Sequence, residues 1–249
     1  MNILLNGFGG KMGGFVKREL EGAEDMTLAA GVDAFFNGET DFKAYKSFDE
    51  VEGRYDCIID FSHPNCIDSM LSYIEKTKTP AVICTTGLSK EQTDKINELS
   101  KSVPVFFSAN MSLGVNLIVD LCKKAAALLD GNFDIEIIEK HHNLKVDAPS
   151  GTALMLANAI NSELDNKFEY VYDRQSVRKK REKTEIGMHS VRGGNIVGEH
   201  EVIFAGHDEC ISIKHQATSK EVFAVGAVKA ARFLASQKAG MYQMSDMLK

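Results

Sequence analysis

The sequence predicts an α/β protein that combines a doubly wound parallel sheet with a second, α+β domain. Three observations support this prediction. Short apolar runs alternate with helical patterns as far as Asn110, a glycine-rich turn joins the first strand to the first helix, and the later part of the chain alternates apolar with polar residues. Strands that alternate with helices imply right-handed crossovers and a parallel sheet. A period of two is typical of strands with one buried face.

The first part of the chain contains the strands expected of the parallel sheet. They are short and apolar, as buried parallel strands usually are, and span residues 2–6, 26–32, 55–61, 80–85 and 103–108. Helical patterns cover residues 15–20, 66–76 and 90–100, and the polar segment 34–50 is expected to be irregular. This order predicts a Rossmann-type domain, in which ligands bind at the carboxyl ends of the strands.

A different pattern follows Asn110. Helices are expected at 115–129 and 152–164, and strands at 134–139, 186–191, 195–204 and 210–217. Glycine-containing turns separate the later strands, and an apolar helix is expected at 222–236. The alternating strands predict a mixed sheet in a separate α+β domain.

The composition narrows the class of protein. The chain has 249 residues, of which 44% are hydrophobic and 26% charged, as is ordinary for a globular enzyme of one to two domains. A net charge of −6 argues against a nucleic-acid or membrane-surface binder. The five cysteines lack C-x-x-C spacing, so neither a disulfide framework nor a structural zinc site is expected. Without a basic leader or an apolar stretch of membrane length, we expect a reducing, cytoplasmic location.

A glycine-rich turn indicates a dinucleotide site. Glycines at 7, 10 and 13 follow the first strand and open the first helix, although the spacing is not a strict G-x-G-x-x-G. Such a turn brings backbone N–H groups and a helix N-terminus close to a pyrophosphate. A tight turn without a ligand is the alternative, because the glycine pattern alone is weak. The candidate cofactor contacts in this turn are Gly7, Phe8, Gly9, Gly10, Lys11 and Met12.

Asp33 ends the second strand, where such domains place the acid that binds the adenosine ribose. Its carboxylate would repel a 2′-phosphate, and the next residue, Ala34, is not basic, so NADH is favoured over NADPH. Lys11 can neutralise a phosphate, which leaves NADPH as an alternative. Further cofactor candidates at later strand ends, each of which is singly an ordinary turn or cap residue, are Ser62, Cys84, Thr85, Thr86, Ser108, Ala109, Asn110 and Met111.

A second group of polar residues follows the strand at 134–139. His141, His142 and Lys145 fall within five residues of one another, and the loop then enters a helix at Ser150, Gly151 and Thr152. A helix N-terminus beside a lysine makes a site for a small anion such as a carboxylate. Hydride transfer to a C=N or conjugated C=C bond creates negative charge that an acid must neutralise, and either histidine or Lys145 could serve.

This group of residues has two other interpretations, a zinc site and a polar loop that binds no ligand. A zinc site is not expected, because adjacent histidines do not easily share one ion and no third ligand has suitable spacing. A polar loop that leads into a capped helix is the simplest alternative.

Taken together and in this order, the motifs resemble those of the 4-hydroxy-tetrahydrodipicolinate reductase family, also called dihydrodipicolinate reductases. EIIEKHHNLKVDAPSGTA at 136–153 matches the family signature, and GFGGKMG at 7–13 is similar to its nucleotide turn. Further similar segments are DFSHP at 60–64, TTG at 85–87, NMSLGVN at 110–116, IGMHSVRGGNIVGEHEVIF at 186–204, FAVGAVKAA at 223–231 and GMYQMSDML at 240–248.

The resemblance implies a dinucleotide-binding domain at 1–112 and 221–249, and a substrate-binding and tetramerisation domain at 113–220. It implies a homotetramer that reduces 4-hydroxy-tetrahydrodipicolinate or dihydrodipicolinate to tetrahydrodipicolinate with NAD(P)H, in lysine and diaminopimelate biosynthesis. His141 would be the general acid, and Lys145 would assist it. The small dicarboxylate substrate would be held by His142, Lys145, Ser150, Gly151 and Thr152. The cofactor would contact the residues of the glycine turn, Asp33, and the strand-end residues at 84–86 and 108–111.

The chain departs from the family pattern in places, and rival hypotheses remain. Cys84 stands where glycine is common, and its side chain could crowd the cofactor or point away from it. Ala34 stands where arginine often follows the acid, which counts against dual cofactor use. One rival is a reductase of the same architecture that acts on another imine or semialdehyde; the other is a redox sensor that binds NADH without chemistry. The basic run at 174–183 is expected to be a solvated loop, and His189, His200 and His215 are expected to be structural.

Overall fold

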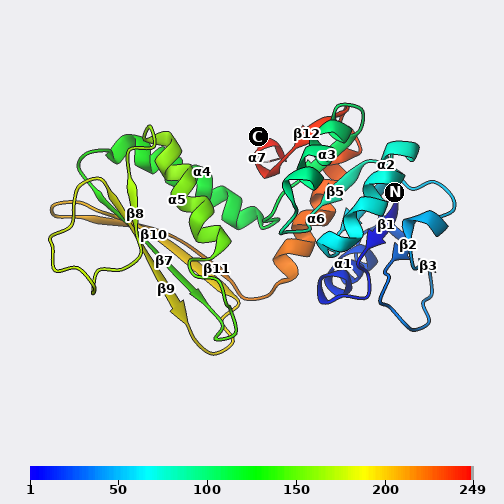
Figure 1. The fold of residues 1–249 in the computed structure, drawn as a ribbon, viewed down its shortest axis with the longest axis horizontal. Coiled ribbons are helices and arrows are strands. Elements are labelled where there is room, and N and C mark those ends of the chain that lie inside the picture. The colour runs from blue at the N-terminus through cyan, green and yellow to red at the C-terminus, as the bar shows by residue number, and fades with distance from the viewer. Residues whose placement is uncertain (248–249) are drawn as a thin grey trace. The chain divides into compact units, whose positions relative to one another are not determined.

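The computed structural model describes residues 1–247, which form two compact units (Figure 1). The first comprises Met1–Leu113 and the chain from Lys220 onward, and the second is Gly114–Ser219. The second unit is therefore inserted into the first. None of the helices within residues 1–247 is long and apolar enough to cross a membrane.

The first unit contains a wholly parallel sheet in the order β12-β6-β5-β4-β1-β2-β3. This confirms the predicted doubly wound fold. Two short edge strands, β3 and β12, were not predicted, because three residues of mixed polarity carry no periodic signal. The strands are β1 (Asn2–Asn6), β2 (Thr27–Val32), β3 (Lys43–Tyr45), β4 (Cys57–Asp60), β5 (Ala81–Ile83), β6 (Pro104–Phe107) and β12 (Gly240–Tyr242).

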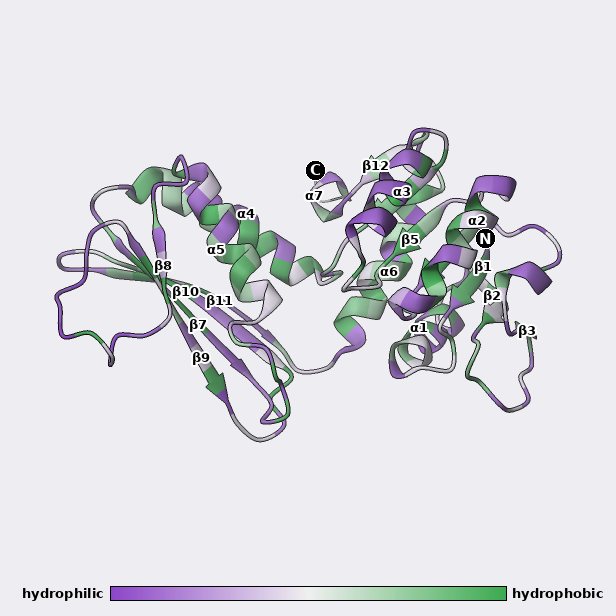
Figure 2. Cartoon of the chain, in the orientation of Figure 1, coloured by the Kyte–Doolittle hydropathy of each residue, from purple (hydrophilic) through white to green (hydrophobic). Residues whose placement is uncertain are grey.

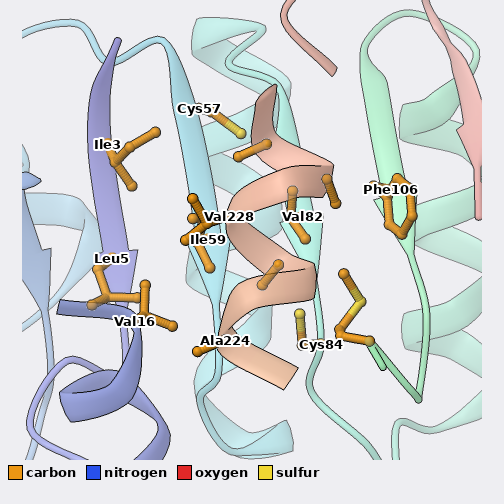
Figure 3. Close-up of a cluster of buried hydrophobic side chains, with 14 of the residues drawn as sticks. Ile3, Leu5, Val16, Cys57, Ile59, Val82, Cys84, Phe106, Ala224 and Val228 are labelled. Atoms are coloured by element: carbon orange, nitrogen blue, oxygen red, sulfur yellow. The ribbon is translucent and has the colours of Figure 1, made fainter. Parts of the chain in front are cut away.

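Helices cover both faces of this sheet. The helix α6 packs across β4, β5 and β6, with Ala224 and Val228 against Val82 and Phe106 (Figure 3). On the other face, buried residues of α2 and α3 form a second apolar cluster with the strands. The helices of the unit are α1 (Lys11–Glu21), α2 (Ile67–Thr77), α3 (Lys90–Ser100), α6 (Glu221–Leu234) and the short α7 (Met244–Met247), together with 3-10 turns at Phe48–Glu50 and Pro64–Cys66.

The second unit is built on a mixed sheet in the order β11-β10-β7-β9-β8. β7 and β9 are parallel, whereas β10 is antiparallel to both β7 and β11. The helices α4 (Leu113–Leu129) and α5 (Gly151–Glu163) pack on one face over a core that includes Ile137, Val202 and Phe204 (Figure 1). The strands are β7 (Asp134–His141), β8 (Glu169–Val171), β9 (Glu185–Arg192), β10 (Gly198–Ala205) and β11 (Cys210–Ala217).

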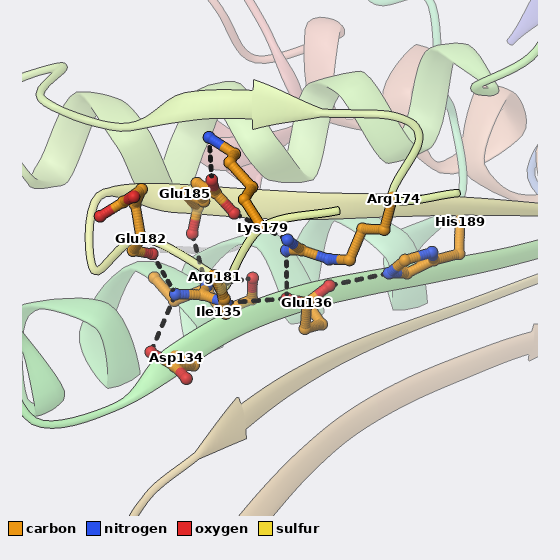
Figure 4. Close-up of polar contacts among 9 residues, drawn as sticks. All are labelled: Asp134, Ile135, Glu136, Arg174, Lys179, Arg181, Glu182, Glu185 and His189. Carbon is orange, nitrogen blue, oxygen red and sulfur yellow. Dashed lines mark hydrogen bonds and ion pairs between the residues drawn. The ribbon is translucent and has the colours of Figure 1, made fainter. Parts of the chain in front are cut away.

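The basic segment between β8 and β9 is fixed to the sheet rather than merely solvated. Arg181 donates to Glu136 Oε1 at 2.9 Å and Asp134 Oδ1 at 2.8 Å, and Arg174 donates to Glu185 Oε2 at 2.8 Å (Figure 4). Gly187 makes room for this cluster, since a Cβ there would lie 1.8 Å from the Glu136 carboxylate. Although the segment is largely hydrophilic (Figure 2), two of its guanidinium groups are therefore already paired with carboxylates of the chain.

Candidate functional site

The turn between β1 and α1 requires glycine at two positions and leaves the start of α1 without a side-chain cap. Gly7 has a φ of +80°, and a Cβ there would lie 2.5 Å from the carbonyl oxygen of Phe61. At Gly13 a Cβ would lie 2.4 Å from the Gly7 carbonyl oxygen, so α1 packs directly on the turn. Gly10 is the N-cap residue of α1 and has no side chain to occupy the N–H groups of the first turn. Such a helix start can bind a phosphate group.

Asp33 lies beside this turn at the end of β2. Its carboxylate accepts hydrogen bonds from the backbone N–H groups of Gly9 at 3.0 Å, Phe35 at 2.9 Å and Phe36 at 3.2 Å. It lines a pocket of about 400 Å³ together with Gly7, Gly10 and Ser62. The Asp33 carboxylate is only half-buried, so it remains able to accept hydrogen bonds from a ribose.

Lys46 lines the same pocket and is a residue that the sequence reading missed. The parallel pairing of β3 with β2 aligns Val32 with Tyr45, and the Asp33 N–H donates to the Tyr45 carbonyl. Lys46 therefore lies next to Asp33, although the two residues are well separated in the sequence. Its ammonium donates to the Phe36 carbonyl and to Asn37 Oδ1.

A buried carboxylate, Asp60, ties three strand ends together below the pocket. It is fully buried and accepts hydrogen bonds from Asn6 Nδ2 at 2.9 Å, Ser62 Oγ at 2.6 Å and Thr85 Oγ1 at 2.7 Å. Burial raises the pKa of Asp60, because its partners are neutral and only partly offset the lost hydration. Thr85 and Ser62 are thus held by Asp60.

The other strand-end candidates differ in what they can offer a cofactor. Cys84 points into the apolar cluster beneath α6 (Figure 3), and burial raises the pKa of its thiol. Only the backbone of Cys84 can therefore contact a cofactor. Thr86 and Ala109 are exposed, whereas Met111 is buried against α6, where Gly226 allows the close approach. Phe8 is also buried, so its backbone, like that of Cys84, is the part available to a ligand.

In the second unit, His141 ends β7 and is held by a buried carboxylate. Its Nδ1 lies 2.6 Å from Glu139 Oε2, and Glu139 is 1% exposed. Arg192 donates to both oxygens of Glu139, at 2.8 and 2.7 Å. The backbone N–H of Ser150 donates to Glu139 Oε1 at 3.1 Å. Glu139 therefore joins the histidine strand to the start of α5.

Ser150 is committed to interactions within the protein. Its hydroxyl caps α5 by accepting from the N–H of Ala153 at 3.1 Å, and it lies 2.8 Å from His200 Nε2. The residue is 2% exposed. Gly151 is exposed, with no atom of residues 1–247 in the space that a Cβ would face. The side of α5 that can meet an anion is thus the backbone around Gly151, and Ser150 supports it.

The cations and imidazoles of this group influence one another. Burial lowers the pKa of His141, and the nearby charges of Lys145 and Arg192 act in the same direction against the opposing effect of Glu139. Burial tends to raise the pKa of Glu139, but hydrogen bonds from Arg192 and His141 outweigh it and hold the value at about 2. Burial and the neighbouring His141 lower the pKa of His200 to about 4. His200 is therefore neutral near pH 7.

Lys145 and His142 complete the group. The Lys145 ammonium is 2.8 Å from Asp147 Oδ1, and the backbone N–H of Lys145 donates to the His142 carbonyl. The buried Nδ1 of His142 has no hydrogen-bond partner among the residues described. Within the same residues, no three His, Cys, Asp or Glu side chains are grouped as metal ligands.

Comparisons with known proteins identify relatives along the whole chain. Residues 1–111 match the family model for the N-terminus of dihydrodipicolinate reductase, and residues 114–248 match the model for its C-terminus. The chain is 49% identical over 247 residues to a 4-hydroxy-tetrahydrodipicolinate reductase of Clostridium novyi, covering 99% of this chain and 98% of the relative. A second such reductase, from Caldanaerobacter subterraneus, is 50% identical over 249 residues, covering 100% and 98%.

Solved structures support the fold. A dipicolinate-bound dihydrodipicolinate reductase from Paenisporosarcina superposes with a TM-score of 0.82 at 22% identity, covering 98% of this chain and 97% of the other. An amine dehydrogenase from Mycobacterium smegmatis superposes with a TM-score of 0.66 at 9% identity, covering 98% and 94%. The fold is therefore shared with an amine dehydrogenase, so likeness of fold alone does not identify the reaction.

Proposed function

The chain belongs to the dihydrodipicolinate reductase family, and from this premise we propose how its own residues reduce 4-hydroxy-tetrahydrodipicolinate to tetrahydrodipicolinate. A bound nicotinamide cofactor supplies the hydride. The protein must then hold two carboxylates, orient the ring and deliver a proton. The observation that carries the proposal is the His141–Glu139–Arg192 group beside the start of α5.

His141 is the proposed general acid. Its Nδ1 faces Glu139, so Nε2 is the nitrogen left to protonate the reduced substrate. A dianionic substrate nearby favours the protonated imidazole and opposes the cations that lower the pKa of His141. Substrate binding therefore loads the acid with its proton.

We propose that the substrate carboxylates are bound by Lys145, His142 and the start of α5. Lys145 supplies the full positive charge and assists the acid, and the N–H groups of Gly151 and Thr152 supply the helix N-terminus. Ser150 acts through its hydrogen bonds rather than by direct contact, since it is 2% exposed. Dipicolinate bound to the Paenisporosarcina relative is consistent with a dicarboxylate ligand.

For the cofactor we propose contacts along the ends of β1, β2, β5 and β6. The backbone from Gly7 to Met12 binds the pyrophosphate and Asp33 binds the ribose, with the segments at 84–86 and 108–111 reaching the nicotinamide. NADH is favoured over NADPH because Asp33 repels a 2′-phosphate. The margin is small, because Lys46 stands beside Asp33.

We further propose that the enzyme works as a cytoplasmic homotetramer. The unit 1–112 with 221–249 binds the dinucleotide, and 113–220 binds substrate and forms the subunit contacts. The face of the mixed sheet opposite α4 and α5 is the proposed contact, since the helices cover only the other face. Size-exclusion chromatography with light scattering tests this: a mass of about four chains supports it, and a monomeric mass opposes it.

The function is tested by a coupled assay. The condensation product of pyruvate and aspartate semialdehyde is supplied, and NADH absorbance is followed. Replacing the acid in His141→Gln should lower kcat by about 100-fold or more while the Kd for NADH stays unchanged. A folded wild-type protein that consumes no NADH would overturn the proposed function, and an unchanged kcat in His141→Gln would remove His141 from the acid role.

A further inference from the structure

Glu139 is placed by the register of the sheet as well as by its own bonds. β7 and β9 run parallel, with Glu139 opposite Ser190 and His141 opposite Arg192. Because side chains alternate along a strand, Glu139, His141 and Arg192 all point to the face that α5 covers. The guanidinium therefore meets the carboxylate from the neighbouring strand, in a bidentate pair.

We propose, building on the proposed function, that Glu139 and Arg192 are positioning residues that decide which nitrogen of His141 exchanges its proton. Glu139 accepts the Nδ1–H of His141 and keeps that proton in place throughout the reaction. The exchanging proton is then confined to Nε2. Arg192 keeps Glu139 ionised, so the carboxylate accepts the Nδ1–H without removing it.

The surroundings of Nε2 fit this assignment. A Cβ at position 198 would lie 3.2 Å from His141 Nε2, so Gly198 leaves this side of the ring uncrowded. The ring of His200 is 5.1 Å away, but its Nε2 is bonded to Ser150 Oγ. His200 is also neutral near pH 7, so it neither competes for the proton nor repels it strongly.

The groups around His141 predict opposite effects for the two positioning residues. The charged ones are Glu139 on β7, Arg192 on β9 and Lys145 in the loop that follows β7, and Lys145 is itself paired with Asp147. His200 on β10 also faces the ring but is neutral near pH 7. Glu139 favours the imidazolium, whereas Arg192 and Lys145 oppose it. Loss of Glu139 should therefore lower the pKa of the acid, and loss of Arg192 should raise it.

The experiment measures kcat/KM for the dicarboxylate substrate across pH. With a general acid, kcat/KM falls as pH rises through the acid's pKa. In Glu139→Gln this fall should move to lower pH, with kcat reduced tenfold or more and KM for NADH unchanged. In Arg192→Gln the fall of kcat/KM should move to higher pH. Arg192→Lys keeps the positive charge and should bring the fall back towards its wild-type pH.

A control is Glu163→Gln. Glu163 is the last residue of α5 and pairs with Lys123 at 3.5 Å, so it lies on the helix side of the sheet rather than on the proposed subunit contact. No hydrogen bond or ion pair joins it to His141. Its pH profile should match the wild type. If both site variants lose activity but keep the wild-type pH position, their role is only structural and the proposal fails. If the wild type itself does not turn over, it is the proposed function that fails.

A second measurement does not depend on turnover. Nitrogen NMR of the unliganded, histidine-labelled protein reports which ring nitrogen of His141 carries the proton, with His141→Gln used to assign its signals. We expect protonated Nδ1 in the wild type and in Glu163→Gln, and a mixture of the two tautomers in Glu139→Gln. A wild-type ring protonated at Nε2 alone when neutral would overturn the proposal.

Discussion

The two units each place a buried carboxylate beneath their proposed binding site, but they stabilise it differently. Asp60 in the first unit is fully buried and bonded only to neutral donors, from Asn6, Ser62 and Thr85. Glu139 in the second unit is 1% exposed and bonded to a guanidinium and an imidazole. The pKa of Asp60 is raised by its burial, whereas bonds to Arg192 and His141 hold that of Glu139 at about 2.

This difference fits the role proposed for each site. The proposed cofactor site of the first unit needs strand ends at fixed positions, and hydroxyl and amide groups can provide that without a net charge. In the proposed mechanism, the second unit needs a proton held on one nitrogen of His141 and released from the other. A carboxylate that stays ionised is suited to that task, and only the paired cation makes it stable in a buried place.

The largest expected effect comes from applying the same change to both carboxylates. In Asp60→Asn the new amide N–H₂ can donate to Thr85, whose hydroxyl can turn to accept, so we expect a loss of about 1 kcal/mol in unfolding free energy. In Glu139→Gln the amide meets Arg192, which can only donate, and we expect a loss of about 3 kcal/mol. Urea unfolding of both variants and the wild type measures the two losses. Equal losses of unfolding free energy would contradict the claim that the neutral partners of Asp60 and the cationic partner of Glu139 make the two replacements unequally costly.

The sequence predicted the parts of both sites that lie close together in the chain. The glycine turn, Asp33, and the run from His141 to Thr152 are each encoded within a few residues of an element boundary, where local rules for strands, turns and helix starts apply. Lys46 and Arg192 were missed as site residues because strand pairing brings them there, Lys46 through β3 and Arg192 through β9. Glu139 was given no role of its own, because it was predicted to be the last residue of the strand at 134–139.

His200 illustrates the same limit. It lies in an alternating strand and was expected to be structural, yet it contacts Ser150 and faces His141. The alternation of apolar and polar residues along this strand places the His200 side chain on one face of the sheet. It does not show which residues of the neighbouring strands lie beside His200. His200 lies near His141 because β10 pairs with β7 rather than with β9. The order of strands in a mixed sheet cannot be predicted from the spacing of residues in the sequence.

A smaller effect should appear when the same two variants are compared at different pH. Glu139 has a folded pKa of about 2, below its ordinary 4.5, so its contribution to stability is full above about pH 4.5 and is lost as pH falls towards 2. Asp60 has a raised folded pKa, so its contribution is full below its ordinary pKa and is lost as pH rises through the folded value.

As pH is lowered from about 6 to about 3, the loss of unfolding free energy caused by Glu139→Gln should therefore become smaller. The loss caused by Asp60→Asn should become larger over the same range. Unfolding curves of the wild type and both variants at the two pH values measure these changes. Each variant is a control for the other, because a general effect of pH on unfolding would act on both in the same direction. Changes of the same sign in both variants would contradict the assigned environments.

The smallest expected effect concerns Lys46, the cation at the edge of the first unit's pocket. Its ammonium is exposed and already donates to the Phe36 carbonyl, so it can offer a 2′-phosphate only a screened, partly satisfied charge. Lys46→Met should lower kcat/KM for NADPH about twofold to fivefold and leave that for NADH nearly unchanged. Added salt should reduce this difference, because an exposed charge is screened, whereas the effect of Glu139→Gln should resist salt.

The control is Lys43→Met, which removes an exposed lysine of the same strand region that does not line the pocket. An unchanged ratio of the two cofactors in Lys46→Met would mean that Asp33 alone sets the preference for NADH, and the margin between the cofactors would then be larger than proposed.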